Sequence, residues 1–374
     1  MQMIQIIRTK INSTNSYLLL FALTGLISAI FHGLGLTKIL PWTIVYSDML
    51  GFFERVSAPG FVYLDKLLEY PVLTGLFIQF MGILGQSRTG YYVLSAVFLI
   101  FFGLLSTYFL MKITDEGAKK RMLKYWIFAP SIFMFSVFNW DILAILFTIL
   151  AFYSFHKEKE LWGVFFLALG FCAKFYPVLY LAPLLLSKRK VGDWIKIISV
   201  FVAVVLVVNI YFMVSNYDGW AYFFTLNSTR NSNPDSIWTV ARFAIYDFSI
   251  PQINTMSLLF FSISYLWILI KYKKAPFLLL CFAGTILFFL FNKVFSPQYI
   301  LWFLPFLVLI PIEIKKSFYV VEFSNIASFF IIVPWFFSHN IANFYWSIPF
   351  VLIRHIALIV ILLSVLKRAR IYNH

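Results

Sequence analysis

Residues 194–215 read WIKIISVFVAVVLVVNIYFMVS, an apolar run whose one charged side chain is Lys196. A helix needs about 20 mostly apolar residues to cross a bilayer. Runs of similar size recur at 17–36, 91–111, 253–270, 275–291, 320–338 and 346–366. Shorter apolar runs lie at 125–138, 140–155, 161–173, 175–186 and 298–312. The pattern predicts an all-α chain that crosses a membrane many times.

The composition excludes a soluble protein. Of the 374 residues, 62% are hydrophobic and only 12% are charged, whereas soluble domains carry about 25% charged residues. The mean hydropathy is +0.88. The sequence therefore predicts one transmembrane domain over residues 1–374, with the lipid bilayer as its surroundings.

The formal net charge of +15 does not indicate nucleic acid binding, because the basic residues form short clusters between apolar runs. Loops that stay in the cytoplasm keep an excess of Lys and Arg. The clusters are Arg8/Lys10, Lys112 to Lys124, Lys157/Lys159, Lys188 to Lys190, Lys271 to Lys274, Lys315/Lys316 and Lys367 to Arg370. Placing all of them inside requires an even number of crossings between neighbours. About twelve transmembrane helices satisfy this, with both termini inside.

One apolar stretch, 71–86, does not fit this count as a crossing. It is short and is interrupted by Gly75, Gln79, Gly82 and Gly85, so we expect a helix that lies on the external interface. Two long external segments then remain, at about 37–90 and 216–252. Loops of this length are uncommon unless they are functional, which predicts that the protein acts on its outer face.

Acidic residues also collect in the external segments. Asp48 follows Tyr46 and Ser47 in the first external segment, and Asp141 sits in a predicted tight turn after Asn139 and Trp140. A carboxylate at the membrane edge can act as a general base toward a hydroxyl group. The ordinary alternative is that these acids, with others such as Asp235, are solvated loop residues.

Basic residues at membrane depth are more specific candidates. Lys174 and Lys293 each interrupt apolar sequence beside a proline, and Arg354 lies inside the last apolar run. Ionisable groups within spanning segments mark functional sites by default. Cations at the membrane edge suit a lipid-linked phosphate. The alternative is snorkelling of long side chains toward the headgroups.

Four stretches carry a family resemblance. They are Tyr46-Ser47-Asp48, LEYPVLT at 68–74, AKFYP at 173–177 and FNKVFSPQY at 291–299. In this order they resemble motifs of the GT-C class of membrane glycosyltransferases. Within that class they look like the polyprenyl-phosphate-sugar mannosyltransferases, which include the GPI mannosyltransferase I family and its prokaryotic relatives.

The resemblance implies a transferase that moves a hexose, with mannose favoured, from a polyprenyl or dolichyl phosphate donor. The acceptor is a hydroxyl of a glycan or glycolipid on the external or lumenal face, and the anomeric carbon is inverted. The membrane is the plasma membrane in a prokaryote and the endoplasmic reticulum in a eukaryote. An accessory membrane subunit is a further possible partner.

The resemblance also implies residue roles. Asp48 acts as the catalytic base, and Asp141 or Glu69 orients the acceptor. Lys174 and Lys293, with Arg354, hold the donor phosphate. Sugar or lipid contacts are expected from Tyr70, Tyr176, Gln298 and Tyr299. The family often has a second acid two residues after the first, but position 50 is Leu50. We therefore predict no metal site and no cofactor, with a divalent cation as the alternative.

Three other classes stay open on sequence alone. A transporter or lipid flippase also places charges in the membrane, but usually shows inverted repeats, and no convincing repeat is visible here. A glycan polymerase or ligase would share the polyprenyl substrate without a motif like that of Asp48. A structural subunit would tolerate Asp48→Asn without loss.

Overall fold

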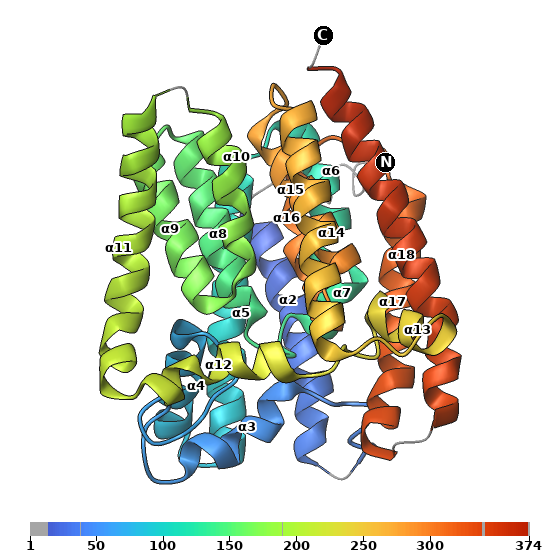
Figure 1. Cartoon of the computed structure of the whole chain (residues 1–374). Helices are drawn as coiled ribbons and strands as arrows, with labels where there is room; N and C mark the ends of the chain where they lie inside the picture. The colour runs from blue at the N-terminus through green and yellow to red at the C-terminus, as the bar shows by residue number, and fades with distance from the viewer. Residues whose placement is uncertain (1–13, 38, 189, 339–340, 373–374) are drawn as a thin grey trace, which may run out of the picture.

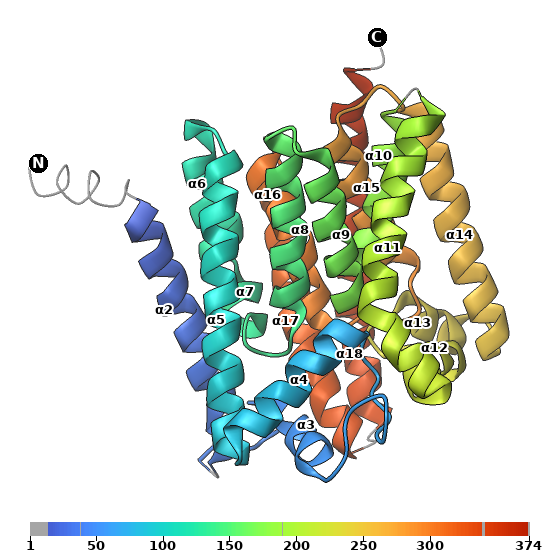
Figure 2. The ribbon, with the colours of Figure 1, turned by 90° about the vertical axis from the view of Figure 1, so that its left-hand side faces the viewer.

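The computed structural model describes residues 14–37, 39–188, 190–338 and 341–372. The regular secondary structure of this part is helical, apart from one isolated bridge between Val62 and Lys66. Six of its helices are long and apolar enough to cross a membrane, so the chain is an integral membrane protein. They are α2 (Thr14–Gly33), α5 (Arg88–Ile113), α11 (Val191–Ser215), α14 (Ile250–Lys271), α17 (Lys315–Ser338) and α18 (Ile341–Arg370). Figures 1 and 2 show them standing upright in one bundle.

Shorter apolar segments fill the bundle between the long helices. They are η3 (Leu123–Ile127) with α7 (Pro130–Phe135), α8 (Asp141–His156), α9 (Glu160–Ala173), η4 (Tyr176–Tyr180) with α10 (Leu181–Leu186), α15 (Phe277–Phe291), and η5 (Pro297–Trp302) with α16 (Leu304–Leu309). Helices α8 and α15 are buried along most of their length. The predicted number of about twelve crossings is not confirmed, because six helices in the described ranges reach spanning length.

Proline explains why several of these segments are short. Pro177 and Pro297 stand at the first turns of η4 and η5. Proline lacks a backbone N–H and is best tolerated in the first turn of a helix. Irregular backbone at membrane depth is tolerated where protein buries it, and Tyr180 and Ile300 on these turns are fully buried. The breaks therefore lie inside the bundle.

Four helices gather at one end of the bundle, which we call the loop end (Figure 1). They are α3 (Asp48–Ser57), α4 (Val72–Gly85), α12 (Tyr217–Thr229) and α13 (Ile237–Ala244). All four come from the segments predicted to be external, and Figure 2 shows α4 inclined to the upright helices. The short α6 (Lys119–Met122), preceded by the 3-10 turn η2 (Glu116–Ala118), and the basic last turn of α18 lie at the opposite end.

That the basic clusters face the cytoplasm and the loop end faces outward stays a prediction. Of the predicted features, the Arg8/Lys10 cluster, residue 189 and part of the turn at 339–346 lie outside the described residues.

The start of α4 is fixed by a close approach at Gly75. A Cβ atom there would lie 1.7 Å from the hydroxyl oxygen of Tyr63. That hydroxyl donates to the carbonyl oxygens of Tyr70 at 2.8 Å and Pro71 at 3.0 Å. Because Gly75 has no side chain, the buried Tyr63 can hold the backbone that enters α4. This backbone, at Tyr70 and Pro71, lines the cavity of the candidate active site.

Candidate active site

A cavity of about 600 Å³ opens among the helices of the loop end. This volume lies in the range of small-molecule sites. Segments far apart in sequence contribute its wall: the start of α3, the approach to α4, the end of α9, the end of α12, the loop after α15, η5 and α17. Eight of the ten residues predicted from sequence line it: Asp48, Glu69, Tyr70, Lys174, Tyr176, Lys293, Gln298 and Tyr299.

Asp48 is the first residue of α3 and is held there by its neighbours. The Ser47 side chain caps the helix by accepting from the backbone N–H of Met49 at 3.3 Å, and its hydroxyl donates to the carbonyl oxygen of Phe138 at 2.7 Å. The hydroxyl of Tyr46 donates to Oδ1 of Asp48 at 2.9 Å.

Burial raises the pKa of Asp48 to about 6, although the bond from Tyr46 and the charge of Lys174 both lower it. A carboxyl group with this pKa changes protonation close to neutral pH, as a general base requires.

Lys174 directly follows α9, and its side chain lines the cavity. Its Nζ forms an ion pair with Oδ1 of Asp141 at 2.6 Å, and Nε1 of Trp302 donates to the other carboxylate oxygen at 2.9 Å. The ammonium lies 5.2 Å from the ring centre of Tyr70 and 5.5 Å from that of Tyr299. Asp141 itself is buried and does not line the cavity. Its carboxylate therefore acts on the site through Lys174.

Aromatic rings form a stacked wall beside this lysine. The ring of Trp302 stacks on Tyr299 at 3.9 Å between centres and on Tyr176 at 4.3 Å. The hydroxyl group of Tyr176 is 2.8 Å from that of Thr148 on α8. Such rings combine a flat apolar face with a polar edge, so this wall is a rigid surface against which a ligand can pack.

Arg354 does not reach the cavity. Its side chain is fully buried in α18, where Nη1 donates to Oδ1 of Asp235 at 3.0 Å and to Oδ1 of Asn325 at 3.0 Å. Its Nη2 donates to the backbone carbonyl oxygen of Asp235, and the Ser328 hydroxyl donates to the Asp235 carboxylate. Asp235 is thus buried rather than a solvated loop acid, and the pair joins the segment between α12 and α13 to α17 and α18.

Arg230 lines the cavity although the sequence argument did not single it out. It follows the end of α12, and its carbonyl oxygen accepts from Nζ of Lys293 at 2.9 Å. A signal for it exists in the sequence: Arg230 is one of the few basic residues in a segment predicted to be external. Cations on that side are exceptions to the positive-inside pattern.

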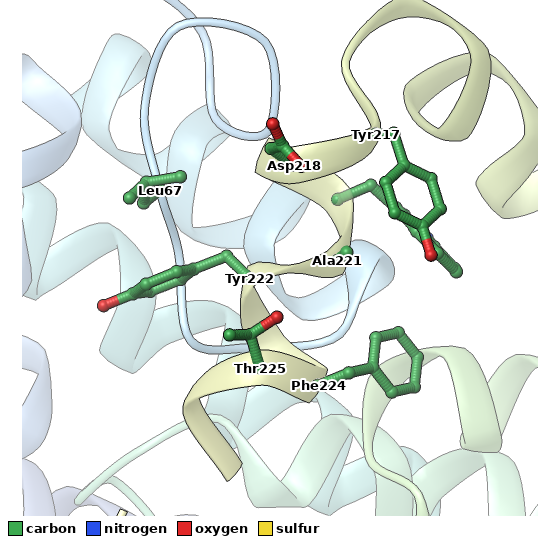
Figure 3. Close-up of a pocket in the computed structure, with 8 residues that line it drawn as sticks. Leu67, Tyr217, Asp218, Ala221, Tyr222, Phe224 and Thr225 are labelled. Atoms are coloured by element: carbon green, nitrogen blue, oxygen red, sulfur yellow. The ribbon is translucent and has the colours of Figure 1, made fainter. Parts of the chain in front are cut away.

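A second hollow, of about 580 Å³, lies on α12 and is drawn in Figure 3. Figure 3 shows Tyr217 and Phe224 on one side of the helix, and Tyr222 near Leu67 of the preceding external segment on the other. Asp218 is the one charged residue among its lining, and Phe224 also lines the larger cavity. Of these two cavities in the described part of the chain, the larger one alone is lined by both acids and cations, so we take it as the candidate active site.

The structure is a bundle of helices long enough to span a membrane, with a cavity at one end that is lined by charged and aromatic side chains. Residues 68–297, more than half of the chain, match the model of glycosyltransferase family 87, and the chain belongs to this family. The match includes Lys174, Arg230 and Lys293 and begins after Asp48. No curated protein matches the chain. The protein is therefore a membrane glycosyltransferase.

No group of three or more His, Cys, Asp or Glu side chains that could hold a metal ion occurs in the described part of the chain. The sequence prediction of no metal site stays a prediction.

Proposed function

We propose that the protein transfers a hexose from a polyprenyl or dolichyl phosphate to a hydroxyl group of a glycan or glycolipid, with inversion at the anomeric carbon. Mannose is the favoured sugar because the four short motifs resemble those of polyprenyl-phosphate-mannose-dependent enzymes, including the GPI mannosyltransferase I family. Membership of glycosyltransferase family 87 favours this function over a transporter or a structural subunit. The proposal includes no cofactor.

The topology that we propose has twelve crossings. The six long helices would be joined by six shorter segments, namely η3 with α7, α8, α9, η4 with α10, α15, and η5 with α16. The loop end then faces the outside of a prokaryotic plasma membrane or the lumen of the endoplasmic reticulum. The basic last turn of α18 supports this direction, since positive residues stay in the cytoplasm.

Asp48 is the proposed general base, and its position carries the proposal. Its carboxylate takes the proton of the acceptor hydroxyl as that oxygen attacks the anomeric carbon of the donor. The bond from this carbon to the phosphate oxygen breaks, and polyprenyl phosphate leaves with the electron pair. A single displacement of this kind inverts the anomeric carbon. The raised pKa of Asp48, about 6, supports its role as proton acceptor.

The other predicted residues take supporting roles. Glu69 is held in an ion pair with Arg55 at 2.6 Å and would orient the acceptor. Lys174, positioned by Asp141, would face the reacting groups, and Lys293 would hold the donor phosphate. Arg354, which was expected to contact the donor phosphate, instead holds Asp235 in our proposal. Contacts to sugar or lipid are proposed for Tyr70, Tyr176, Gln298 and Tyr299.

The test is sugar transfer by the purified protein in lipid, with radiolabelled polyprenyl-phosphate-mannose and a panel of glycolipid acceptors. Asp48→Asn should lose at least about 100-fold in rate, because a general base contributes roughly that much or more. Glu54→Gln is the matched control. It lies on the same helix, and its carboxylate is exposed in an ion pair with Arg88 at 2.6 Å.

Equal rates for Asp48→Asn and the control would remove Asp48 from the mechanism. If mannosyl, glucosyl and arabinosyl donors all fail with every acceptor, the proposed donor class is wrong.

A further inference from the structure

The charges that line the cavity are unequally compensated. Of its three carboxylates, Glu69 forms an ion pair with Arg55 and Asp235 with Arg354. Asp48 forms no ion pair with any of the described residues. On the side of the cations, Lys174 is neutralised by Asp141. This pairing leaves Asp48 as the acid that is available for chemistry.

The same comparison leaves two cations of the cavity without an acidic partner, Arg230 and Lys293. Neither side chain forms an ion pair with a carboxylate in the part of the chain that the structure describes. Nη2 of Arg230 donates to Oδ1 of Asn233 at 2.9 Å, while Nζ of Lys293 donates to the carbonyl oxygens of Arg230 and Ser228. These partners are neutral, so the positive charge of both side chains is not balanced.

The two cations are held close together by one small network. The backbone N–H of Asn233 donates to the carbonyl oxygen of Lys293 at 2.9 Å, which ties the end of α12 to the loop after α15. Burial, followed by the charge of Arg230, lowers the pKa of Lys293. Two neighbouring cations without a counter-charge in a partly buried site are unfavourable, and an anion between them would remove that cost.

We propose that Arg230, together with Lys293, binds the phosphate group of a lipid-linked phosphate at the membrane edge. The identification of this ligand as the polyprenyl phosphate of the donor rests on the function proposed above. Guanidinium offers several N–H donors in a planar fork that matches phosphate oxygens, and Asn233 occupies one arm of that fork. Lys174 and Arg354 are excluded from this site because acidic residues already pair with them.

This assignment separates the two ends of the reaction. The proton acceptor Asp48 stands at the start of α3, whereas the phosphate site lies between the end of α12 and the loop before η5. A sugar held between them has the attacking hydroxyl on one side and the leaving phosphate on the other. Such an arrangement stabilises the negative charge that develops on the leaving phosphate.

The experiment measures ligand binding by calorimetry, with the full-length protein in nanodiscs of neutral phosphatidylcholine. The probes are a polyprenyl phosphate, the corresponding polyprenol and inorganic phosphate. Arg230→Gln should weaken binding of the polyprenyl phosphate about 10- to 100-fold, as expected for a lost hydrogen bond to a charged group, and leave polyprenol binding unchanged. Arg242→Gln is the control, since Arg242 pairs with the exposed Asp247 and does not line the cavity.

Binding of inorganic phosphate with the same dependence on Arg230 would support the site and locate recognition in the phosphate group itself. Equal affinity of wild type and Arg230→Gln for polyprenyl phosphate would overturn the proposal, as would equal binding of phosphate and alcohol by the wild type. Nanodiscs with added phosphatidylglycerol test whether the site binds the phosphate of bulk lipid. If phosphatidylglycerol weakens binding of polyprenyl phosphate equally in the wild type and in Arg230→Gln, the proposal is also overturned.

Where Arg230→Gln does not fold, Arg230→Lys and Lys293→Gln replace it, and each should lose part of the affinity. Sugar transfer is measured on the same samples. Loss of transfer with every donor, while phosphate binding still depends on Arg230, refutes the proposed function alone. Normal transfer with a phosphate affinity that Arg230→Gln leaves unchanged refutes this inference alone.

Discussion

Asp235→Asn should destabilise the protein strongly, because it removes the charge that balances Arg354. Both side chains are buried, with 4% of Asp235 and 0% of Arg354 exposed, so solvent does not weaken the interaction. Removing one partner of a buried ion pair costs about 3–5 kcal/mol, since it leaves the other charge without compensation. Asparagine can still accept the hydrogen bonds from Ser328 and Arg354. The loss of stability therefore reflects the missing charge and not a change in side-chain shape.

The measurement is the free energy of unfolding, obtained from denaturant unfolding in a fixed detergent. Asp247→Asn is the matched control, because Asp247 pairs with Arg242 at 2.6 Å with 80% of its side chain exposed. An exposed pair of this kind contributes about 0–1 kcal/mol. The double variant Asp235→Asn/Arg354→Gln should recover stability, as both charges are then gone. Equal losses for Asp235→Asn and Asp247→Asn would refute the reasoning.

Further predictions concern the base and the packing. Transfer at limiting substrate should fall about tenfold per pH unit below a pH of about 6, because the raised pKa of Asp48 leaves it protonated there; a rate that stays flat to pH 4 contradicts this. Tyr46→Phe removes a bond that lowers the pKa of Asp48, so the acid limb of the pH profile should move to higher pH, and a shift to lower pH would count against it. Gly75→Ala should destabilise by about 1–3 kcal/mol in denaturant unfolding through its clash with Tyr63. Gly51→Ala, with open space around it, should cost nothing, and equal losses would argue against the clash.

Hydropathy predicts six of the seven long runs correctly because spanning length is a local property, whereas the run 275–291 corresponds to α15, which is shorter than spanning length. The run 194–215 corresponds to α11, and 253–270 to α14. The shorter runs are harder to interpret, since 175–186 and 298–312 each contain a 3-10 turn followed by a helix. A proline in the sequence indicates a break but does not say whether the two pieces together cross the bilayer.

The residues of the site divide in the same way. Short sequence motifs contain Asp48, Lys174 and Lys293. These motifs predict that the three residues belong to one site at the loop end. The pairing of Asp235 with Arg354 joins residues 119 positions apart, and no local pattern encodes it. Arg230 was missed for a related reason, because its place in the cavity depends on how α12 ends against the loop of Lys293.

The pair between Asp235 and Arg354 also bears on how the protein is made. The acid is translated 119 residues before its partner, which at roughly 5–20 residues per second takes about 6–24 s. During that interval the growing chain holds a carboxylate that cannot yet be buried with its counter-charge. The cavity wall that carries Asp235 therefore takes its final place only when α18 enters the bilayer. We therefore expect the site to be complete only after the last helix has inserted.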